Sequence, residues 1–313
     1  MTAAHGARPR VLALRALGLG DFCTAVPAMR ALRRAFPDHE LVLAAPAWQA
    51  SLARLAGVER LATTQALSPL PRRETAPAVA VNLHGRGPQS TRRLMDIAPR
   101  RLICYRHPVL PETDRSPRWS ADEHEVARWC RLLEEHGIAA DPSELALDPP
   151  NARPVVAGAV IVHPGAAAGA RRWPAHRFAT VVRRLVDHRE QVVITGSKDE
   201  QPIAETIVAH AGARCGGVVN LCGRTSIDEL CATVAAARAL ISNDTGVAHL
   251  AYAYRIPSVV LFGPTRPDHW GPPQGPHVAL WSGRTGDPHA DEVDPGLTTI
   301  TPADVLDALS CLI

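Results

Sequence analysis

The chain of 313 residues is 46% hydrophobic, a length and composition that suit two globular domains of ordinary size. Its net charge is only +3, from 34 basic and 31 acidic residues, which excludes an electrostatic argument for a nucleic acid partner or for more than peripheral membrane contact. The seven cysteines show neither a C-x-x-C pair nor zinc-ligand spacing, which favours a reduced, cytoplasmic protein. No apolar run suits a transmembrane segment or a signal peptide, and we expect neither.

The first half of the chain alternates between short apolar runs and segments with helical apolar spacing. The predicted strands occupy residues 11–14, 40–45, 79–83 and 102–105. The predicted helices occupy residues 24–36, 49–56 and 123–136. A glycine-rich turn over 18–21 follows the first strand, and a polar loop over 82–88 follows the third. This alternation predicts a parallel, doubly wound sheet.

A proline-rich stretch over 147–154 predicts a linker between an N-terminal domain over 1–150 and a C-terminal domain over 151–313. In the second domain, strands are predicted at 159–162, 191–195, 218–221, 239–242 and 258–262. Its predicted helices occupy 178–186, 203–211, 227–237 and 247–253. Residues 271–298 are rich in Gly, Pro, Asp and His and are predicted as a long loop. A terminal helix within 301–313, capped by Thr301, is a candidate to pack back on the N-terminal domain.

Polar residues follow five of the predicted strands and indicate where a ligand would bind. These residues are Asp21, His84, His163, Ser197 and Asp244. Ligands of open α/β sheets bind outside the carboxyl ends of the strands. We therefore expect an α/β protein in which two Rossmann-like, doubly wound domains face a central cleft lined by these turns.

The stretch 241–250 is the most informative one, because a buried strand passes into a helix through a tight polar turn. Asp244 and Thr245 are residue types that cap helices, and Gly246 lets the backbone approach a ligand closely. The free N–H groups and the positive dipole end of such a helix suit a phosphate or pyrophosphate. The alternative is an ordinary capped helix between two strands.

Several motifs together resemble glycosyltransferase family 9, the heptosyltransferase-like enzymes with the two-domain GT-B fold. In chain order the motifs are Gly18-Leu19-Gly20-Asp21, His163-Pro164-Gly165, Arg172-Trp173-Pro174, the block Asn243 to His249, Phe262-Gly263-Pro264-Thr265 and Trp270-Gly271-Pro272. They cover most of the chain and stand in the family's order. The resemblance implies the GT-B fold and an inverting, metal-independent bacterial glycosyltransferase. It also implies a nucleotide diphosphate sugar as donor, in this family ADP-heptose.

The resemblance assigns the catalytic base to Asp21, which stands at the position of the family's catalytic aspartate. Glycosyl transfer to a hydroxyl needs such a group to take the acceptor proton. Gly20 would let the backbone pass close to the sugar or the acceptor. The alternative role for Asp21 is that of a helix N-cap, for which its position is equally suitable.

The resemblance places the donor on the C-terminal domain. The family's donor-binding turn matches Asp244, Thr245, Gly246 and His249. Main-chain N–H groups of this turn would face phosphate oxygens, while Asp244 would bind sugar hydroxyls or cap the helix. His249 lies one turn into the helix, and its alternative role is that of a core histidine. Glu200 resembles a family residue that contacts the nucleotide ribose.

A further donor contact is expected after the first strand of the C-terminal domain. Gly165 would allow close approach of a phosphate, but Ala166 and Ala167 stand where relatives often carry Ser or Thr. Arg171 and Arg172 would then have to supply the missing hydrogen-bond donors. Arg171 matches the position of a phosphate-binding lysine in some relatives, and an arginine can bind phosphate in a bidentate manner.

The acceptor is expected on the N-terminal domain, where one segment is dense in hydrogen-bond donors. These donors are His84, Arg86, Gln89, Arg92 and Arg93, and they would hold an acidic or polyhydroxyl acceptor. The alternative is a solvated, charged loop. The acceptor stays open between the lipopolysaccharide core usual for the family, another glycan or lipid-linked glycan, and a small specialised metabolite.

The sequence contains no Asp-x-Asp motif, which agrees with metal-independent transfer, and we expect no metal and no cofactor beside the nucleotide-sugar co-substrate. Without a Walker A or a full Gly-x-Gly-x-x-Gly motif, neither a P-loop kinase nor a standard dehydrogenase is predicted. Two rival functions stay open. One is a nucleotide-sugar epimerase of the same fold, and the other is a non-catalytic nucleotide-sugar-binding protein, although a pure binder would need no base at Asp21.

Overall fold

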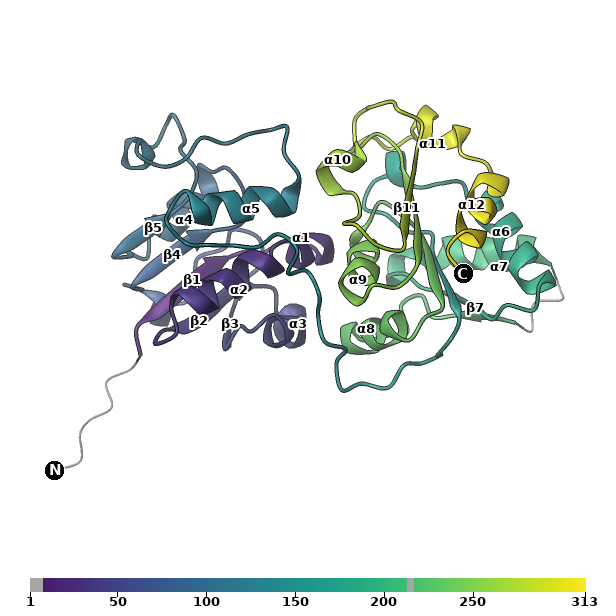
Figure 1. Cartoon of the computed structure of the whole chain (residues 1–313), viewed down its shortest axis with the longest axis horizontal. Coiled ribbons are helices and arrows are strands. Elements are labelled where there is room, and N and C mark those ends of the chain that lie inside the picture. Colours follow the sequence, from purple (N-terminus) through teal and green to yellow (C-terminus); the bar gives the residue numbers. More distant parts are fainter. Residues whose placement is uncertain (1–7, 213–216) are drawn as a thin grey trace. The chain divides into compact units, whose positions relative to one another are not determined.

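The computed structural model describes residues 8–212 and 217–313, and the chain divides into two compact units, Met1–Leu145 and Ala146–Ile313. The division falls just before the predicted linker, whereas the expected boundary lay between residues 150 and 151. Each unit contains one parallel sheet with helices along its strands (Figure 1), as the alternation of elements predicted. Within the described residues, no helix combines the length and the apolar character needed to cross a membrane.

The sheet of the N-terminal unit has five parallel strands in the order β3-β2-β1-β4-β5. Its strands are β1 (Arg10–Leu14), β2 (Glu40–Ala45), β3 (Arg60–Thr63), β4 (Val79–Asn82) and β5 (Arg101–Ile103). From β1 the chain winds to β2 and β3 on one side, and it then continues with β4 and β5 on the other side. The winding direction therefore reverses between β1 and β4. Such a switch point is where open α/β sheets bind their ligands.

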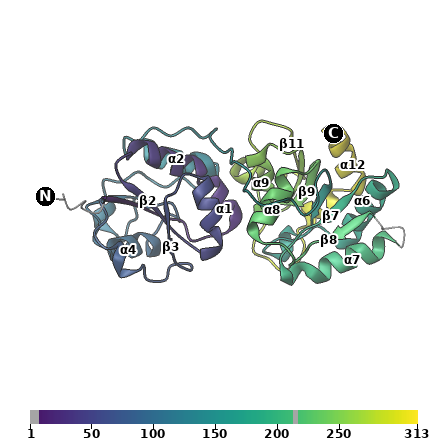
Figure 2. The same cartoon turned by 90° about the horizontal axis from the view of Figure 1, so that it is seen from below.

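The helices of the N-terminal unit cover both faces of this sheet. They are α1 (Leu19–Thr24), α2 (Val26–Ala35), α3 (Ala50–Leu55), α4 (Gln89–Met95) and α5 (Glu125–Glu134), with short 3-10 turns η1 (Ala47–Gln49), η2 (Arg72–Glu74) and η3 (Pro111–Thr113). Figure 2 shows α2 and α4 on opposite sides of the sheet. On the α4 side, Leu12 and Leu14 of β1 pack with Leu94. Because strand residues alternate between faces, Val11 and Ala13 point to the opposite side, where both are buried.

Two local predictions in this unit were wrong. The segment expected as a turn over 18–21 is the start of α1, in which Gly18 is the N-cap and Asp21 lies in the first turn. An acidic residue there is favourable because the helix dipole is positive at its N-terminus. The strand β3 was not predicted, because its four residues lie at the sheet edge and include the charged Arg60 instead of an apolar run.

The sheet of the C-terminal unit has six parallel strands in the order β11-β10-β9-β6-β7-β8. Its strands are β6 (Val160–His163), β7 (Val192–Ile194), β8 (Val218–Asn220), β9 (Ala239–Asn243), β10 (Ser258–Phe262) and β11 (His277–Trp281). The strands β6, β9 and β10 are buried along their whole length, which is why their sequences read as apolar runs. Here the winding direction reverses between β6 and β9.

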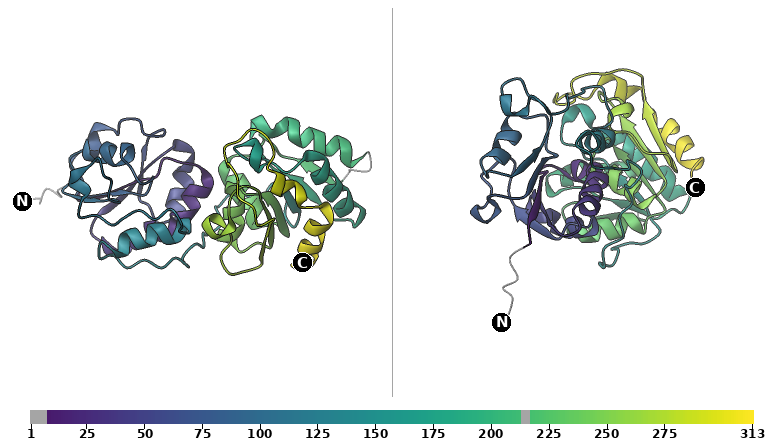
Figure 3. Two further views of the ribbon diagram at one scale, coloured as in Figure 1. Left: turned by 90° about the horizontal axis from the view of Figure 1, so that it is seen from above. Right: turned by 60° about the vertical axis from the view of Figure 1, so that its left-hand side comes forward.

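Helices also cover both faces of the C-terminal sheet. They are α6 (Ala175–Asp187), α7 (Gln201–Ala211), α8 (Ile227–Ala235), α9 (Gly246–Tyr254), α10 (Pro267–Trp270), α11 (Pro295–Thr299) and α12 (Pro302–Ser310), with 3-10 turns η4 (Gly169–Arg171) and η5 (Lys198–Glu200). On one face Val259 and Leu261 of β10 pack with α6, α7 and α12, and on the other face Val260 and Phe262 pack with α9. Figure 3 shows the strands of each unit enclosed between helices.

One prediction about the end of the chain was also wrong. The segment expected as a long loop over 271–298 contains β11 and the start of α11. The strand β11 lies at the sheet edge and is only half-buried, so its short sequence does not stand out between Gly- and Pro-rich neighbours. Thr301 caps α12 as predicted, and Val305 and Leu309 of this helix are buried in the core of the C-terminal unit, beside α6. Its expected packing on the N-terminal domain stays a prediction.

Candidate active site

Asp21, the predicted base, lies on α1 just beyond the carboxyl end of β1. Its Oδ2 accepts a hydrogen bond from the Gly18 N–H at 3.3 Å, and its Oδ1 lies 3.3 Å from Nη2 of Arg15. The side chain is 31% exposed, so a substrate hydroxyl can reach it. Burial raises the pKa of Asp21, the Arg15 charge opposes this rise, and Glu125 adds to it. The predicted alternative, an N-cap, is wrong in position, because Gly18 is the N-cap.

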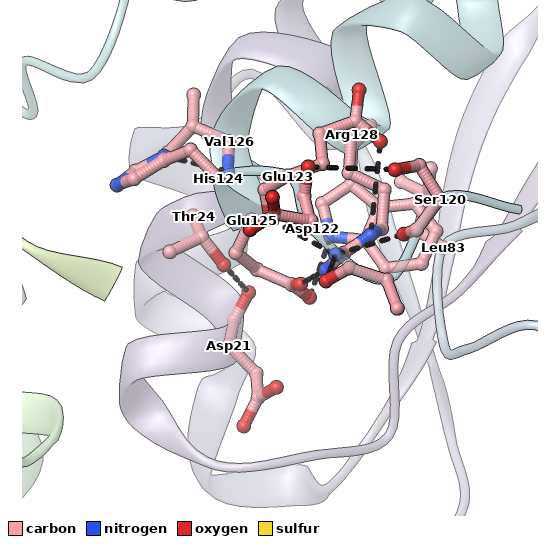
Figure 4. A network of polar contacts seen from close by, with 12 residues as sticks. Asp21, Thr24, Leu83, Ser120, Asp122, Glu123, His124, Glu125, Val126 and Arg128 are labelled. Atoms are coloured by element: carbon pink, nitrogen blue, oxygen red, sulfur yellow. Dashed lines mark hydrogen bonds and ion pairs between the residues drawn. The ribbon is translucent and has the colours of Figure 1, made fainter. Parts of the chain in front are cut away.

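A buried polar network that the sequence did not indicate adjoins Asp21 (Figure 4). Arg15 has no exposed surface, and its Nη2 lies 3.0 Å from Oε1 of Glu125. The Glu125 carboxylate also accepts a hydrogen bond from the Trp129 indole at 2.9 Å and forms an ion pair with Arg128. Figure 4 shows Asp21 on one helix and Glu125 with Arg128 on another.

His84 follows β4, on the other side of the same switch point. The ring Nδ1 of His84 accepts a hydrogen bond from the backbone N–H of Ala16 at 3.2 Å. The backbone N–H of His84 donates to Oδ1 of Asn82 at 3.0 Å. Burial lowers the pKa of His84 to about 4, and the Arg15 charge adds to this effect. The ring is therefore neutral at pH 7 with its proton on Nε2, so it offers one hydrogen-bond donor instead of a positive charge.

The other predicted acceptor residues separate in the structure. Gly20 lies in α1 next to Asp21, whereas Gln89 and Arg92 lie exposed on α4. Arg86 contributes to a cavity of about 640 Å³, which Gln89 and Arg92 do not line. Of the predicted acceptor residues, Arg86 is therefore the one that lines this cavity, and the acceptor role of the segment stays a prediction.

The cavity beside Arg86 contains residues that sequence reasoning missed. Its lining comprises Arg86, Arg106, His107, Pro108, Val109, Arg118 and Trp119. Arg106 pairs with Asp114, whereas the guanidinium groups of Arg86 and Arg118 have no ion-pair partner among the described residues. Trp119 forms an aromatic wall whose ring centroid lies 4.4 Å from the guanidinium carbon of Arg128. The sequence did offer one indication of this cavity, the long connection between β5 and α5, because long connections in compact domains are often binding loops.

In the C-terminal unit, the buried Asn243 joins the two turns at the switch point. It ends β9, its Nδ2 donates to the Pro164 carbonyl at 2.7 Å, and its Oδ1 accepts from the Trp173 N–H at 3.1 Å. The turn after β6 and the segment before α6 are thus fixed to β9 by one side chain. This contact holds the predicted donor-binding turns together.

Gly165 was predicted to let a phosphate come close, but in the structure it lies against the side chain of Glu200. A Cβ atom at this position would overlap the carboxylate of Glu200, so the missing side chain makes room for Glu200. The Oε2 of Glu200 accepts a hydrogen bond from the Ser197 N–H at 2.7 Å. Next to this site, burial lowers the pKa of His163, whose Nδ1 lies 2.9 Å from the Thr195 hydroxyl. The structure thus brings the predicted donor residues Gly165 and Glu200 together.

Asp244 is almost fully buried just beyond β9. Burial raises its pKa to about 6, against the effects of the Arg171 charge and of a hydrogen bond from the Thr265 side chain. Asp244 does not cap α9, because Thr245 is the N-cap and no side-chain hydrogen bond closes that end. The N–H groups at Thr245 and Gly246 therefore begin a helix without a side-chain cap.

Two polar atoms near Asp244 lack hydrogen-bond partners among the described residues. They are Nε of Arg171 and the hydroxyl of Tyr252, both buried. Burial, together with the Asp244 charge, raises the pKa of Tyr252. Buried polar atoms in proteins are nearly always paired, so this is a place where a polar ligand would complete the hydrogen bonding.

The remaining predicted donor residues have contacts within the protein. His249 is buried, with its ring centroid 5.3 Å from that of Tyr252 and 6.0 Å from that of Trp270, which fits the alternative of a core histidine. The Nε of Arg172 donates to the Ala166 carbonyl at 2.8 Å and so closes the loop that lacks Ser or Thr. Of the two arginines, Arg171 adjoins Asp244 and Arg172 stabilises the loop.

Metal-ligating side chains do not gather in the part of the chain that the structure describes. No group of three or more His, Cys, Asp or Glu residues there has an arrangement that could hold a metal ion. The described cysteines form no disulfide with one another, and Cys23, Cys104, Cys130, Cys222 and Cys231 are buried.

A family model described as glycosyltransferase family 9 (heptosyltransferase) matches residues 106–296, more than half of the chain. The chain belongs to glycosyltransferase family 9. Among family 9 proteins, lipopolysaccharide heptosyltransferase 2 of Escherichia coli K12 is 36% identical over 159 residues, which are 48% of this chain and 45% of that protein. The chain thus spans about half the length of the curated relatives it matches.

Solved structures of heptosyltransferases agree with the fold over nearly the whole chain. The E. coli ADP-heptose lipopolysaccharide heptosyltransferase II superposes with a TM-score of 0.81 at 21% identity, covering 97% of this chain and 98% of that one. The E. coli heptosyltransferase WaaC, solved with ADP, gives a TM-score of 0.74 at 17% identity, covering 97% and 100%. These likenesses confirm the predicted GT-B fold class. The family 9 match begins at residue 106, so Asp21 lies outside it.

Proposed function

We propose that this family 9 protein is an inverting glycosyltransferase that moves a heptose from ADP-heptose to a hydroxyl of an acceptor. The single observation that carries this proposal is the family match over 106–296, which spans the turns after β6, β9 and β10. The names of the similar proteins support the donor, since one is an ADP-heptose lipopolysaccharide heptosyltransferase and another is a heptosyltransferase solved with ADP.

In the proposed mechanism Asp21 is the general base. It removes the proton from the acceptor hydroxyl as that oxygen forms its bond to the anomeric carbon. On the opposite side of the sugar, the bond from the anomeric carbon to the diphosphate oxygen breaks, and ADP leaves with the electron pair. Attack opposite to the leaving group inverts the anomeric configuration. The raised pKa of Asp21 supports this role, because a carboxylate with higher proton affinity is a stronger base.

The C-terminal unit would bind the donor. The N–H groups at the start of α9 and the Arg171 guanidinium are suited to the diphosphate, where they stabilise the charge that develops on the leaving group. Asp244 would accept hydrogen bonds from sugar hydroxyls, and the unpaired hydroxyl of Tyr252 would join it. Glu200 would contact the ribose with the oxygen that Ser197 does not bind. In this proposal the reaction needs no metal, because these groups supply the positive charge.

The N-terminal unit would bind the acceptor in the cavity beside Arg86. Three arginines and an aromatic wall suit a sugar acceptor that carries carboxylate or phosphate groups, since guanidinium groups bind such anions in a bidentate manner. An assay of ADP release with each class of acceptor decides between a lipid-linked glycan, another glycan and a small molecule. The Trp119 ring offers an apolar face to the sugar.

The variant Asp21→Asn tests the proposed function. We expect it to bind ADP as the natural protein does and to lose transfer by about 10²- to 10⁴-fold, because only the base is removed. Asp96→Asn, at an exposed aspartate in the same unit, is the control and should keep full activity. A near-normal rate in Asp21→Asn would disprove the base assignment. An isomerised sugar nucleotide formed without any acceptor would instead favour the epimerase.

A further inference from the structure

Arg15 is a charged side chain with no exposed surface, and its hydrogen bonds fix its position. Its Nε donates to the Asp21 carbonyl at 2.8 Å, its Nη2 donates to the Thr24 hydroxyl at 3.0 Å, and its Nη1 donates to the Leu83 carbonyl. The guanidinium carbon lies 4.8 Å from the ring centroid of Trp129. A guanidinium is a rigid fork of five N–H donors, so partners on several sides determine both its place and its plane.

These partners belong to three segments that are distant in the sequence. Asp21 lies on α1, Leu83 follows β4, and Glu125 lies on α5; Figure 4 labels all three. The hydrogen bonds of Arg15 therefore join these segments at the switch point of the N-terminal sheet. Arg15 binds Asp21 twice, through the backbone carbonyl and through Oδ1. The Asp21 carboxylate is thereby held in one orientation, although part of its surface stays open to solvent.

Glu125 compensates the positive charge of Arg15. Its Oε1 lies 3.0 Å from Nη2 of Arg15, and the glutamate side chain is only 7% exposed. A buried guanidinium without such a partner would stabilise the ionised Asp21 carboxylate strongly. The pKa of Asp21 would then fall, and the group would be a weaker base. Glu125 is itself held in place by Arg128 and by the indole N–H of Trp129.

We propose that Arg15 is a positioning residue that orients the Asp21 carboxylate, and that Glu125 neutralises Arg15 so that Asp21 remains basic enough to take a proton. This inference rests on the proposed function only for the reason why Asp21 must be basic. The arrangement itself concerns three side chains within one unit. Besides these three, the network has Arg128 on α5, Glu123, whose Oε2 lies 4.0 Å from Nε of Arg128, and the neutral His84 after β4. Asp122 and His124 adjoin it just before α5 (Figure 4).

A purely structural role for this ion pair is the competing explanation, and the chain contains a matched control. Glu74 is also a fully buried carboxylate, and it pairs with Arg60 at 2.6 Å and with Arg73 at 3.0 Å in the same unit. No hydrogen bond or ion pair within the described residues connects Glu74 or its partners to Asp21. Glu74→Gln therefore removes a buried carboxylate of the same kind without altering the charges around Asp21.

The test follows the titration of Asp21 directly, by NMR of the full chain with ¹³C-labelled aspartate carboxyl groups, assigned with Asp21→Asn. We expect Glu125→Gln to lower the Asp21 pKa by about one unit, because the Arg15 charge is then uncompensated. Arg15→Gln should raise it by about one unit, because Glu125 then acts alone. Glu74→Gln should leave it unchanged. Opposite shifts cannot arise from a general loss of stability.

The double variant Arg15→Met with Glu125→Met keeps the inference testable where a single variant does not fold, because apolar replacement of a whole buried ion pair is often tolerated. Its Asp21 pKa should move little, since two opposing charges leave together. Its kcat for ADP release from ADP-heptose with heptose-deficient lipopolysaccharide core should fall about tenfold or more at unchanged KM, because the carboxylate is no longer oriented.

The outcomes separate this inference from the proposed function. Unchanged Asp21 titration in both single variants, or normal kcat in the double variant, overturns the inference even when Asp21→Asn is inactive. Opposite shifts together with a fully active Asp21→Asn would instead uphold the charge arrangement and disprove the base assignment. Because the titration needs no substrate, it decides the electrostatic part whatever the acceptor is.

Discussion

At the scale of single residues, the buried Asp244 lowers the free energy of unfolding when its carboxyl group is ionised. Its pKa rises to about 6 in the folded protein, from an ordinary value of 3.8, so folding opposes its ionisation. A group whose pKa is raised by folding stabilises the protein at low pH, and this contribution is lost as the pH rises through the folded-state value. The loss should therefore develop between about pH 4 and pH 6 and be complete at neutral pH.

The variant Asp244→Asn should therefore be more stable than the natural protein at pH 7.5, by on the order of 2–3 kcal/mol, and nearly equal to it at pH 4. The variant should also bind ADP-heptose more weakly than the natural protein does, while its affinity for ADP stays the same, because the proposed contact is to the sugar. Chemical unfolding at both pH values and calorimetry with the two ligands measure these effects. Asp199→Asn, at an exposed aspartate of the same unit, is the control. Equal stability differences at the two pH values would show that Asp244 has no such cost.

At the scale of elements, the turns of the C-terminal unit depend on Asn243. Replacing it with Ala would leave the Pro164 carbonyl and the Trp173 N–H without their partner in a buried place. We expect Asn243→Ala to lose about 2–4 kcal/mol of unfolding free energy and to bind ADP at least about tenfold more weakly. Asn220→Ala is the control, because Asn220 ends the edge strand β8 of the same sheet, and within the described residues its side chain accepts the local Cys222 N–H. Similar losses in both variants would contradict a special role for Asn243.

At the scale of the whole molecule, each of the two units has its own sheet and core. Thermal unfolding should therefore resolve two transitions, and ADP should raise only the one that belongs to the C-terminal unit. At a hundredfold excess of ADP over its Kd, the expected rise is about 5 °C, and EDTA should leave it unchanged. The same measurement with ADP, UDP, GDP, dTDP and CDP identifies the nucleobase that the donor carries. A shift that requires magnesium would contradict metal-independent binding.

Much of the fold was predictable, because buried parallel strands are continuous apolar runs and their helices have a period of 3.6 residues. The exceptions, β3 and β11, are edge strands that lack such runs. The polar turns after the strands could be located from their residue types, whereas their role in donor binding came from the resemblance to the family and stays a proposal. The partner of Arg15 could not be found in this way, since Glu125 stands far along the chain and only the folded sheet brings the two together. Pairing across such distances has no local pattern.

The contact between Gly165 and Glu200 couples these two positions in the descent of the family. An alanine at 165 would displace the carboxylate, which is the movable end of the Glu200 side chain, and would disturb the hydrogen bond that it accepts from the Ser197 N–H. A shorter side chain at 200 would leave room for the alanine without this displacement. Lineages that carry Ala or Ser in place of Gly165 should therefore carry a shorter residue in place of Glu200 more often than lineages that keep the glycine.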